Sequence, residues 1–349
     1  NFLLLGLPLL EGLSADEMRA VLAHEFAHLS RQHGRIGQRV YCLRRSWEKI
    51  FEQLSKPRVE GEVSLRPLYS KFLDWFWPRF NAHAFVLSRA DEYEADGDAA
   101  RLAGSQHVAS SLLWIKLAAR WWEDYFCTDL WQRANVEGEP PRDAFLKLGG
   151  ELRAGFPATE TPKWIEQAFH QKTTNADTHP CLTERLQAVN QYPRGADRDE
   201  FPAAPAPAAV SAGETWFGDA LTQIRADLGP LWAEEVKELW EERHARAGVL
   251  RHRLERLDQS VPQPEADEDA LWDKARVVLE LKREKEAEPL LRQILTLNPK
   301  HCAANFHLGR VLLDESNSAG VTHLEAVMEE DDESVPAASQ LLHAHYWRT

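Results

Sequence analysis

Cysteine is scarce in this chain of 349 residues, and its few thiols lie far apart. The four cysteines, Cys42, Cys127, Cys181 and Cys302, form neither a Cys-x-x-Cys metal knuckle nor the dense framework of a small disulfide-rich domain. We therefore expect free thiols in a reducing compartment.

Long apolar runs and clusters of basic residues are also lacking. The longest apolar run, residues 2–10, is interrupted by Gly6 and Pro8, whereas a membrane-spanning helix needs about 20 mostly apolar residues. The formal net charge is −14, and no basic run offers the positive surface that nucleic acids require. The sequence predicts a chain that binds no nucleic acid, does not itself span a bilayer and is soluble as given.

Two stretches carry strong helix signals. Ser14, with Glu17 three residues later, forms a capping box before an apolar helical pattern that Gly34 ends. Ser88 caps a second pattern, which ends before Gly104. We expect each pattern to form one amphipathic helix.

The first predicted helix contains the pattern His-Glu-x-x-His. His24 and His28 are four residues apart and lie on one helical face, about 6 Å from each other, where two imidazoles can bind one metal ion. Glu25 can then reach a water bound to that ion. So short a pattern is weak evidence by itself, because two helical histidines are often surface residues. Here they lie within a capped apolar helix, where a buried imidazole needs a partner.

A third metal ligand must come from elsewhere in the chain, because a catalytic zinc takes three protein ligands and leaves one position for water. The second predicted helix offers several acids, and among them only Glu92 and Asp96 share one face at a spacing of four. This pairing lets Glu92 bind the metal while Asp96 orients one of the histidines.

These motifs together resemble the gluzincin peptidase family of bacterial HtpX and the CAAX prenyl proteases. The resemblance covers roughly residues 1–189 and is carried by three segments in the family's order: His24–His28, Ser88–Asp96 and Thr178–Leu186. Three departures affect detail rather than class. Cys181 stands in place of a second proline or a small residue, Ala27 replaces the more common glycine, and Asp91 adds an acid before the third ligand.

The resemblance implies a zinc metalloprotease with one zinc ion per chain, held by His24, His28 and Glu92. Zinc polarises the scissile carbonyl and lowers the pKa of its water, and Glu25 accepts the water's proton and later passes it to the leaving amine. Intact ligands and an intact base are both present in the sequence.

His179 and Arg185 receive roles from the resemblance alone. It implies that His179 helps to stabilise the oxyanion and that Arg185 positions this segment. A structural alternative stays open, in which His179 and Pro180 cap the following helix and Arg185 forms a salt bridge, because a side chain must reach the developing charge to matter.

The C-terminal part of the chain repeats itself. Residues 270–280 align with residues 304–314 at an offset of 34, the period of the tetratricopeptide repeat, and Leu290 and Leu324 keep this offset. A third copy begins at Pro336. Chance amphipathic helices can mimic two adjacent copies, but the period favours true repeats.

The predicted fold class is mainly α: a zincin-like metalloprotease domain, mostly helical with a small β element, then a helical linker region and tetratricopeptide-type α-hairpins. The β element is residues 2–5, either an edge strand that pairs with extended substrate or an ordinary core strand. The predicted domains are residues 1–192, an N-terminally incomplete peptidase; 193–213, an Ala/Pro-rich linker; 214–259, amphipathic helices broken near Gly229-Pro230; 260–269, an acidic linker; and 270–349, the repeats.

The sequence therefore predicts a zinc metalloendopeptidase that acts on protein or peptide substrates, in protein quality control or processing at a membrane, with repeats that bind a protein partner. The chain starts at Asn1 with an apolar segment, which indicates that an upstream part is missing. The resemblance to a membrane-associated family implies a membrane anchor in that part and a peptidase domain on the cytoplasmic side. Two alternatives stay open. One is a non-catalytic scaffold with a structural metal site, against which Glu25 argues, and the other is a peptidase held latent by its own segments.

Overall fold

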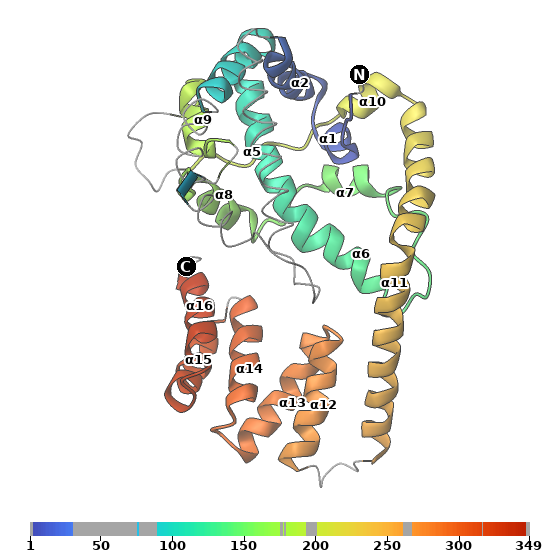
Figure 1. Cartoon of the computed structure of the whole chain (residues 1–349), viewed down its shortest axis with the longest axis vertical. Helices are drawn as coiled ribbons and strands as arrows, with labels where there is room; N and C mark the ends of the chain where they lie inside the picture. The colour runs from blue at the N-terminus through green and yellow to red at the C-terminus, as the bar shows by residue number, and fades with distance from the viewer. Residues whose placement is uncertain are drawn as a thin grey trace. The chain divides into compact units, whose positions relative to one another are not determined.

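Figure 1 shows the computed structural model of the chain, in which residues 3–30, 75–76, 89–174, 177, 179–192, 201–260, 267–315 and 317–346 are described. These residues form helices and connecting segments, and no strand occurs among them. The prediction of a mainly α fold is confirmed. Within the described residues, no helix is both long enough and apolar enough to cross a membrane.

The predicted small β element is wrong for the part of it that the structure describes. Residues 3–6 lie in no strand, and Leu4 is 93% exposed; residues 1–2 lie outside the described part of the chain. Pro8 does not close a strand. It occupies the first turn of α1 (Leu7–Gly12), where the missing N–H of proline leaves no helical hydrogen bond unmade.

Two compact units make up the chain. The first comprises Asn1–Phe126 and Asp143–Gly229, and the second comprises Cys127–Arg142 and Pro230–Thr349. The domain boundaries expected from the sequence stay a prediction.

The first unit contains both of the helices that carry the candidate ligands. Its elements are α1, α2 (Ala15–Ser30), the helix over residues 89–103, α5 (Ser105–Trp121), the π-helical turn η1 (Trp122–Cys127), which runs to the border of the unit, α7 (Leu148–Ala154), α8 (Thr161–His170), α9 (Leu182–Ala188), α10 (Ala212–Phe217) and the first part of α11 (Ala220–Ser260).

The predicted capping box begins α2. The Ser14 backbone N–H donates to Glu17 Oε2 at 2.8 Å, and the Glu17 N–H donates to Ser14 Oγ at 3.4 Å. Ser110 of α5 donates a further hydrogen bond to Glu17, so the cap also ties α2 to α5. The start of α2 is thus fixed about three turns before His24. The predicted helix end at Gly34 lies outside the described residues.

The 89–103 helix packs against α2 through small side chains. Ala20 and Ala99 are 2% and 0% exposed and belong to one core cluster. Gly104 follows the helix, as predicted, and its φ of 96° is a positive value that glycine adopts without strain. The predicted cap, Ser88, lies outside the described residues. Close packing of alanines brings the face with Glu92 towards α2.

A buried ion pair joins α1 to the start of α11. Glu11 is 1% exposed and accepts two hydrogen bonds from Arg225, whose side chain is 15% exposed. Gly149 of α7 lies against the pair, because a Cβ at this position would collide with the Glu11 carboxylate. The Ala212 N–H donates to Leu13 O at 2.7 Å, immediately before α2. α10 and the start of α11 are therefore part of the core of the first unit.

The second unit is built mainly of consecutive packed helices. Its elements are α6 (Thr128–Arg133), α11 from Pro230 onward, α12 (Glu268–Glu280), α13 (Glu284–Leu297), α14 (Cys302–Asp314), α15 (Ala319–Glu330) and α16 (Val335–Tyr346). The predicted break near Gly229-Pro230 does not interrupt the helix, because α11 continues through Pro230.

Helices of the second unit recur at the predicted spacing. α12 and α14 begin at Glu268 and Cys302 and end at Glu280 and Asp314, so both ends are offset by the 34 residues of the sequence repeat. The side chains of Asp267 and His301 cap these two helices at the same offset. The tetratricopeptide identity of these repeats stays a prediction.

Candidate metal centre

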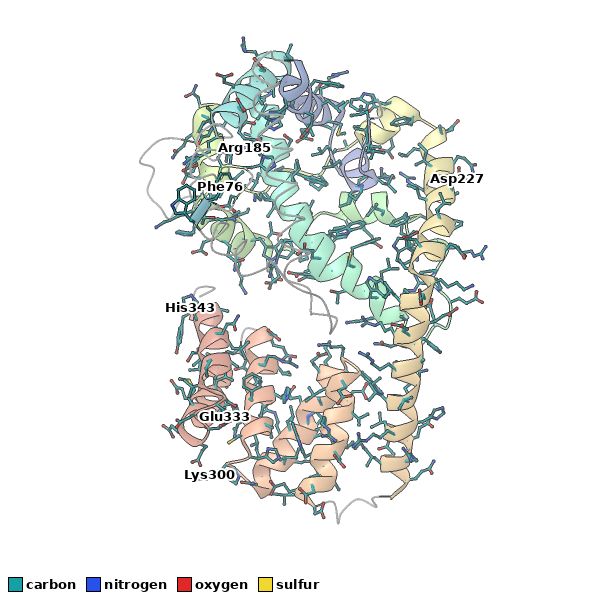
Figure 2. The ribbon with its side chains drawn as sticks, viewed as in Figure 1. Phe76, Arg185, Asp227, Lys300, Glu333 and His343 are labelled. Carbon is teal, nitrogen blue, oxygen red and sulfur yellow. The ribbon has the colours of Figure 1, made fainter. Side chains whose placement is uncertain are left out.

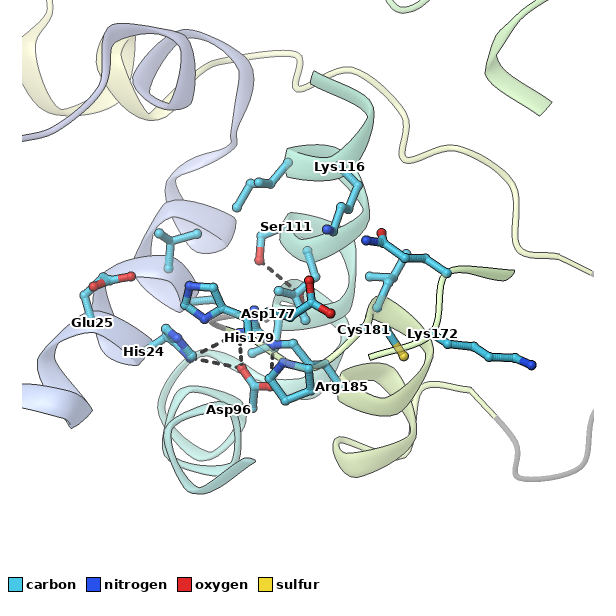
Figure 3. Close-up of a pocket in the computed structure, with 18 residues that line it drawn as sticks. His24, Glu25, Asp96, Ser111, Lys116, Lys172, Asp177, His179, Cys181 and Arg185 are labelled. Atoms are coloured by element: carbon cyan, nitrogen blue, oxygen red, sulfur yellow. Dashed lines mark hydrogen bonds and ion pairs between the residues drawn. The ribbon is translucent and has the colours of Figure 1, made fainter. Parts of the chain in front are cut away.

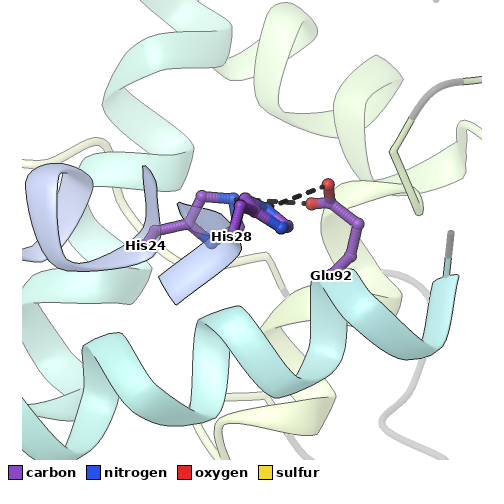
Figure 4. A group of neighbouring side chains, drawn as sticks. All are labelled: His24, His28 and Glu92. Carbon is purple, nitrogen blue, oxygen red and sulfur yellow. Dashed lines mark hydrogen bonds and ion pairs between the residues drawn. The ribbon is translucent and has the colours of Figure 1, made fainter. Parts of the chain in front are cut away.

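Three donor groups from two helices converge in the first unit. His24 and His28 lie one turn apart on α2, and their Nε2 atoms are 3.2 Å apart. Glu92 faces them from the 89–103 helix, with Oε2 3.5 Å from His24 Nε2 and Oε1 3.5 Å from His28 Nε2 (Figure 4). The structure thus brings together the three residues that the sequence singled out as metal ligands.

The spacing of these donors fits a small divalent cation. Zinc bonds of about 2.0–2.1 Å imply about 3.3–3.4 Å between neighbouring ligands of a tetrahedral site. The observed 3.2 and 3.5 Å lie on either side of this length. Glu92 Oε2 is buried, and no described group donates a hydrogen bond to it. A cation would satisfy this buried oxygen, and imidazole with carboxylate is a donor set that zinc accepts.

Asp96 and Arg185 lie on the Nδ1 side of His24, whereas Glu92 faces Nε2. His24 Nδ1 lies 3.0 Å from Asp96 Oδ1, and Asp96 is fully buried. Arg185 of α9, labelled in Figure 2, donates to both oxygens of Asp96 at 2.8 and 2.6 Å. Because Asp96 accepts a hydrogen bond from the Nδ1–H of His24, the lone pair of the ring lies on Nε2, which faces Glu92 and His28.

The protonation states of the cluster suit metal binding. Burial raises the pKa of Glu92, but the hydrogen bond and charge of His179 and the charge of Arg185 outweigh it and lower that pKa overall. Burial also opposes ionisation of Asp96, yet hydrogen bonds from Arg185 and His24 lower its pKa. The pKa of His28 is lowered by burial, despite the nearby Glu92. Ionised carboxylates and a neutral imidazole are the forms that bind a cation.

A cavity of about 320 Å³ adjoins the cluster (Figure 3). Glu25 is exposed and lines it together with His24 and Arg185. His179 also lines the cavity, is 55% exposed at its side chain, and places Nδ1 2.8 Å from Glu92 Oε1. The helix α5 lines the cavity with the apolar Val108, Leu112 and Ile115 and with the polar Ser111 and Lys116. Space for a ligand therefore lies beside Glu25, the candidate base, and His24, one of the candidate ligands.

A second polar cluster, for which no role was predicted, lies beside the centre. Glu184 Oε2 accepts hydrogen bonds from Arg89, Tyr93 and Thr173 at 2.6, 3.0 and 2.8 Å. Arg89, Tyr93 and Glu184 stand within the motif segments, which was a signal for their importance. Thr173 lies in a polar loop with no motif, and sequence reasoning missed it.

Comparison with known proteins agrees with this geometry. The chain matches the model of peptidase family M48 over residues 4–192, more than half of its length. Searches of curated proteins and of solved structures returned no match. The matched range contains the whole cluster, from His24 to Arg185. The chain belongs to peptidase family M48, whose members are zinc metallopeptidases.

Proposed function

We propose that this chain is a zinc-dependent metalloendopeptidase in which His24, His28 and Glu92 hold one zinc ion and Glu25 is the general base. The observation that carries the proposal is the convergence of two imidazole nitrogens and one carboxylate, whose ligand atoms lie 3.2–3.5 Å apart. One oxygen of that carboxylate, Glu92 Oε2, is buried and accepts no hydrogen bond from the described residues. A structural zinc site has four protein ligands. The described cluster has three, beside a cavity.

Several side chains of the site have separate roles in the proposed hydrolysis. When bound, zinc supplies a Lewis acid that polarises the scissile carbonyl and lowers the pKa of water. Glu25 follows His24 directly and is exposed in the cavity, where it can accept a proton from the attacking water and deliver it to the leaving amine. Asp96 and Arg185 hold His24 in the tautomer that presents Nε2 to the metal.

His179 completes the proposed machinery. Its imidazole stands at the cavity beside Glu92, on the side formed by the segment before α9. A donor at this place can stabilise the negative charge that develops on the carbonyl oxygen. We assign His179 this role in the reaction.

Two further parts of the proposal concern substrates and partners. Members of the family are often membrane-associated, and this supports membrane-associated proteins as substrates in quality control or processing. The paired helices α12–α15, which recur at 34 residues, suit a surface that binds a protein partner. No nucleic acid is expected among the partners, since the net charge is −14.

The decisive experiment compares zinc content and casein digestion for wild type, Glu25→Gln and Glu94→Gln. Glu94 is an exposed acid on the 89–103 helix, so the same substitution there is a matched control. We expect about one zinc per chain in all three proteins, activity in wild type and the control, and a loss of at least about 100-fold in Glu25→Gln.

The proposal is overturned if wild type and Glu25→Gln bind equal amounts of zinc and neither digests casein, or both digest it equally well. The first of these results would favour a non-catalytic scaffold stabilised by metal. A variant His28→Ala tests the ligand set independently. It should lose zinc as well as activity, and zinc retained at full affinity would contradict the assignment of His28.

A further inference from the structure

The connection between α8 and α9 runs from residue 171 to residue 181, and its residues 171–174, 177 and 179–181 are described. None of these described residues lies in a helix or strand, and Gln171, Lys172, Asp177 and His179 line one side of the cavity. A segment without helix or strand must satisfy its backbone groups through side chains or water. The position of His179 therefore depends on the few side chains that hold this connection.

Thr173 joins the two ends of the connection. Its hydroxyl accepts a hydrogen bond from the Cys181 backbone N–H at 2.8 Å and donates one to Glu184 Oε2 at 2.8 Å. A hydroxyl can do both at once, whereas a methyl group of the same size can do neither. Cys181 is buried and lies two residues after His179. The Thr173 hydroxyl thus fixes the backbone next to His179.

Glu184 connects this arrangement to the helix that carries Glu92. The same oxygen that receives Thr173 also receives Arg89 Nη2 at 2.6 Å and the Tyr93 hydroxyl at 3.0 Å. Arg89 and Tyr93 stand three residues before and one residue after Glu92. We call Arg89, Tyr93, Thr173 and Glu184 the Glu184 clamp.

The clamp and the metal centre share two elements. The 89–103 helix supplies Glu92 to the centre as well as Arg89 and Tyr93 to the clamp, and α9 supplies Arg185 and Glu184 in consecutive positions. The side chains of Arg89 and Glu184 are 30% and 33% exposed, so water weakens this ion pair only in part. Any shift in the clamp is therefore passed to the segment that sets the distance between His179 and Glu92.

We infer that Thr173 and Glu184 are positioning residues for peptide hydrolysis: they hold the connection so that His179 stays at the Glu92 carboxylate, 2.8 Å away, facing the cavity. This inference rests on the proposed function. Neither residue touches the candidate metal ligands directly. Their contribution is to fix the geometry in which His179 meets the substrate, and small misplacements of a reacting group can cost about 100-fold in rate.

The test replaces Thr173 by valine, which keeps the shape and removes both hydrogen bonds. We expect Thr173→Val to lower kcat about tenfold while KM changes less than about twofold, since binding contacts remain. Thr173→Ser, which keeps the hydroxyl, should restore kcat. The matched control is Thr183→Val on α9, because the Thr183 hydroxyl bonds to Phe169 O at 2.9 Å and takes no part in the clamp.

A double-mutant cycle separates positioning from general stability. In a His179→Ala background, Thr173→Val should change kcat less than about twofold, because the residue that it positions is absent. A fall of the same tenfold in both backgrounds would overturn the inference. Glu184→Gln supplies a second variant: it keeps the shape of the side chain and weakens the bond from Arg89, so kcat should fall in the same direction.

A measurement that needs neither zinc nor substrate tests the clamp even if the proposed function is wrong. Cys181 is 9% exposed, and loosening of the connection should expose its thiol. Alkylation at Cys181, followed by peptide mass spectrometry in metal-free protein, should be faster in Thr173→Val than in Thr183→Val. Equal rates together with equal kcat would refute the clamp. Inactive wild-type protein with faster alkylation in Thr173→Val would refute only the proposed function.

Discussion

The ion pair between Glu11 and Arg225 permits a quantitative test of how the first unit is held together. Arg225→Met removes both hydrogen bonds that Glu11 accepts from α11 but keeps most of the aliphatic stem. Because Glu11 is 1% exposed, its carboxylate then remains in the interior without this countercharge.

The expected cost follows from the burial of both groups. Removing one partner of a buried ion pair costs about 3–5 kcal/mol. For a unit of this size, 1 kcal/mol lowers Tm by about 2–4 °C, so the unfolding transition of the first unit should fall by roughly 6–20 °C. An exposed pair gives the matched control. The side chains of Arg120 and Asp124 are 46% and 39% exposed. Arg120→Met breaks their ion pair and should cost less than about 1 kcal/mol.

Differential scanning calorimetry measures both variants, and a double variant completes the test. Glu11→Leu combined with Arg225→Met replaces the pair by apolar side chains and should recover most of the lost stability. The reasoning is refuted if Arg225→Met unfolds no earlier than Arg120→Met, or if the double variant is as unstable as Arg225→Met alone. Success would show that the start of α11 stabilises the unit that carries the metal centre.

Three further predictions concern the centre and the second unit. Asp96→Asn should weaken zinc binding by about 10- to 100-fold in chelator competition, because His24 loses its orienting carboxylate; unchanged affinity would contradict that role. Gly309→Ala should destabilise the second unit in urea unfolding, because the new Cβ would lie 2.8 Å from a leucine side chain of α15. The control Gly248→Ala places its Cβ in open helical surroundings and should stabilise the unit by up to about 1 kcal/mol. Equal effects of the two substitutions would refute the packing argument. Burial and a nearby arginine lower the pKa of His307 from 6.5 to about 4, so the unfolded chain takes up the proton at a higher pH than the folded chain, and stability is lost as the pH falls from 6.5 to 4. In urea unfolding, His307→Gln should lose about 2 kcal/mol less stability than wild type between pH 7 and pH 4.5. If wild type and His307→Gln lose the same stability over this range, His307 is not the source of the pH dependence.

The sequence by itself determined the features that one continuous stretch of helix can encode. The spacing of His24 and His28, and of Glu92 and Asp96, places each pair on one helical face, and the structure brings their groups together as expected. The cap of α2 and the 34-residue offset of α12 and α14 are local or periodic in the same way. Helical geometry alone converts such spacing into position.

Only the tertiary structure decided contacts between distant stretches and the state of ambiguous segments. Glu11 and Arg225 are 214 positions apart, and Thr173 belongs to no motif, so no local pattern marks either as a partner. Residues 2–5 were predicted to form a strand, but the described residues 3–6 lie in no strand and α1 begins at Leu7. The helix α11 continues through Pro230, although proline usually ends a helix. The physical reason is that burial and charge pairing depend on which surfaces meet, and this is a property of the whole fold.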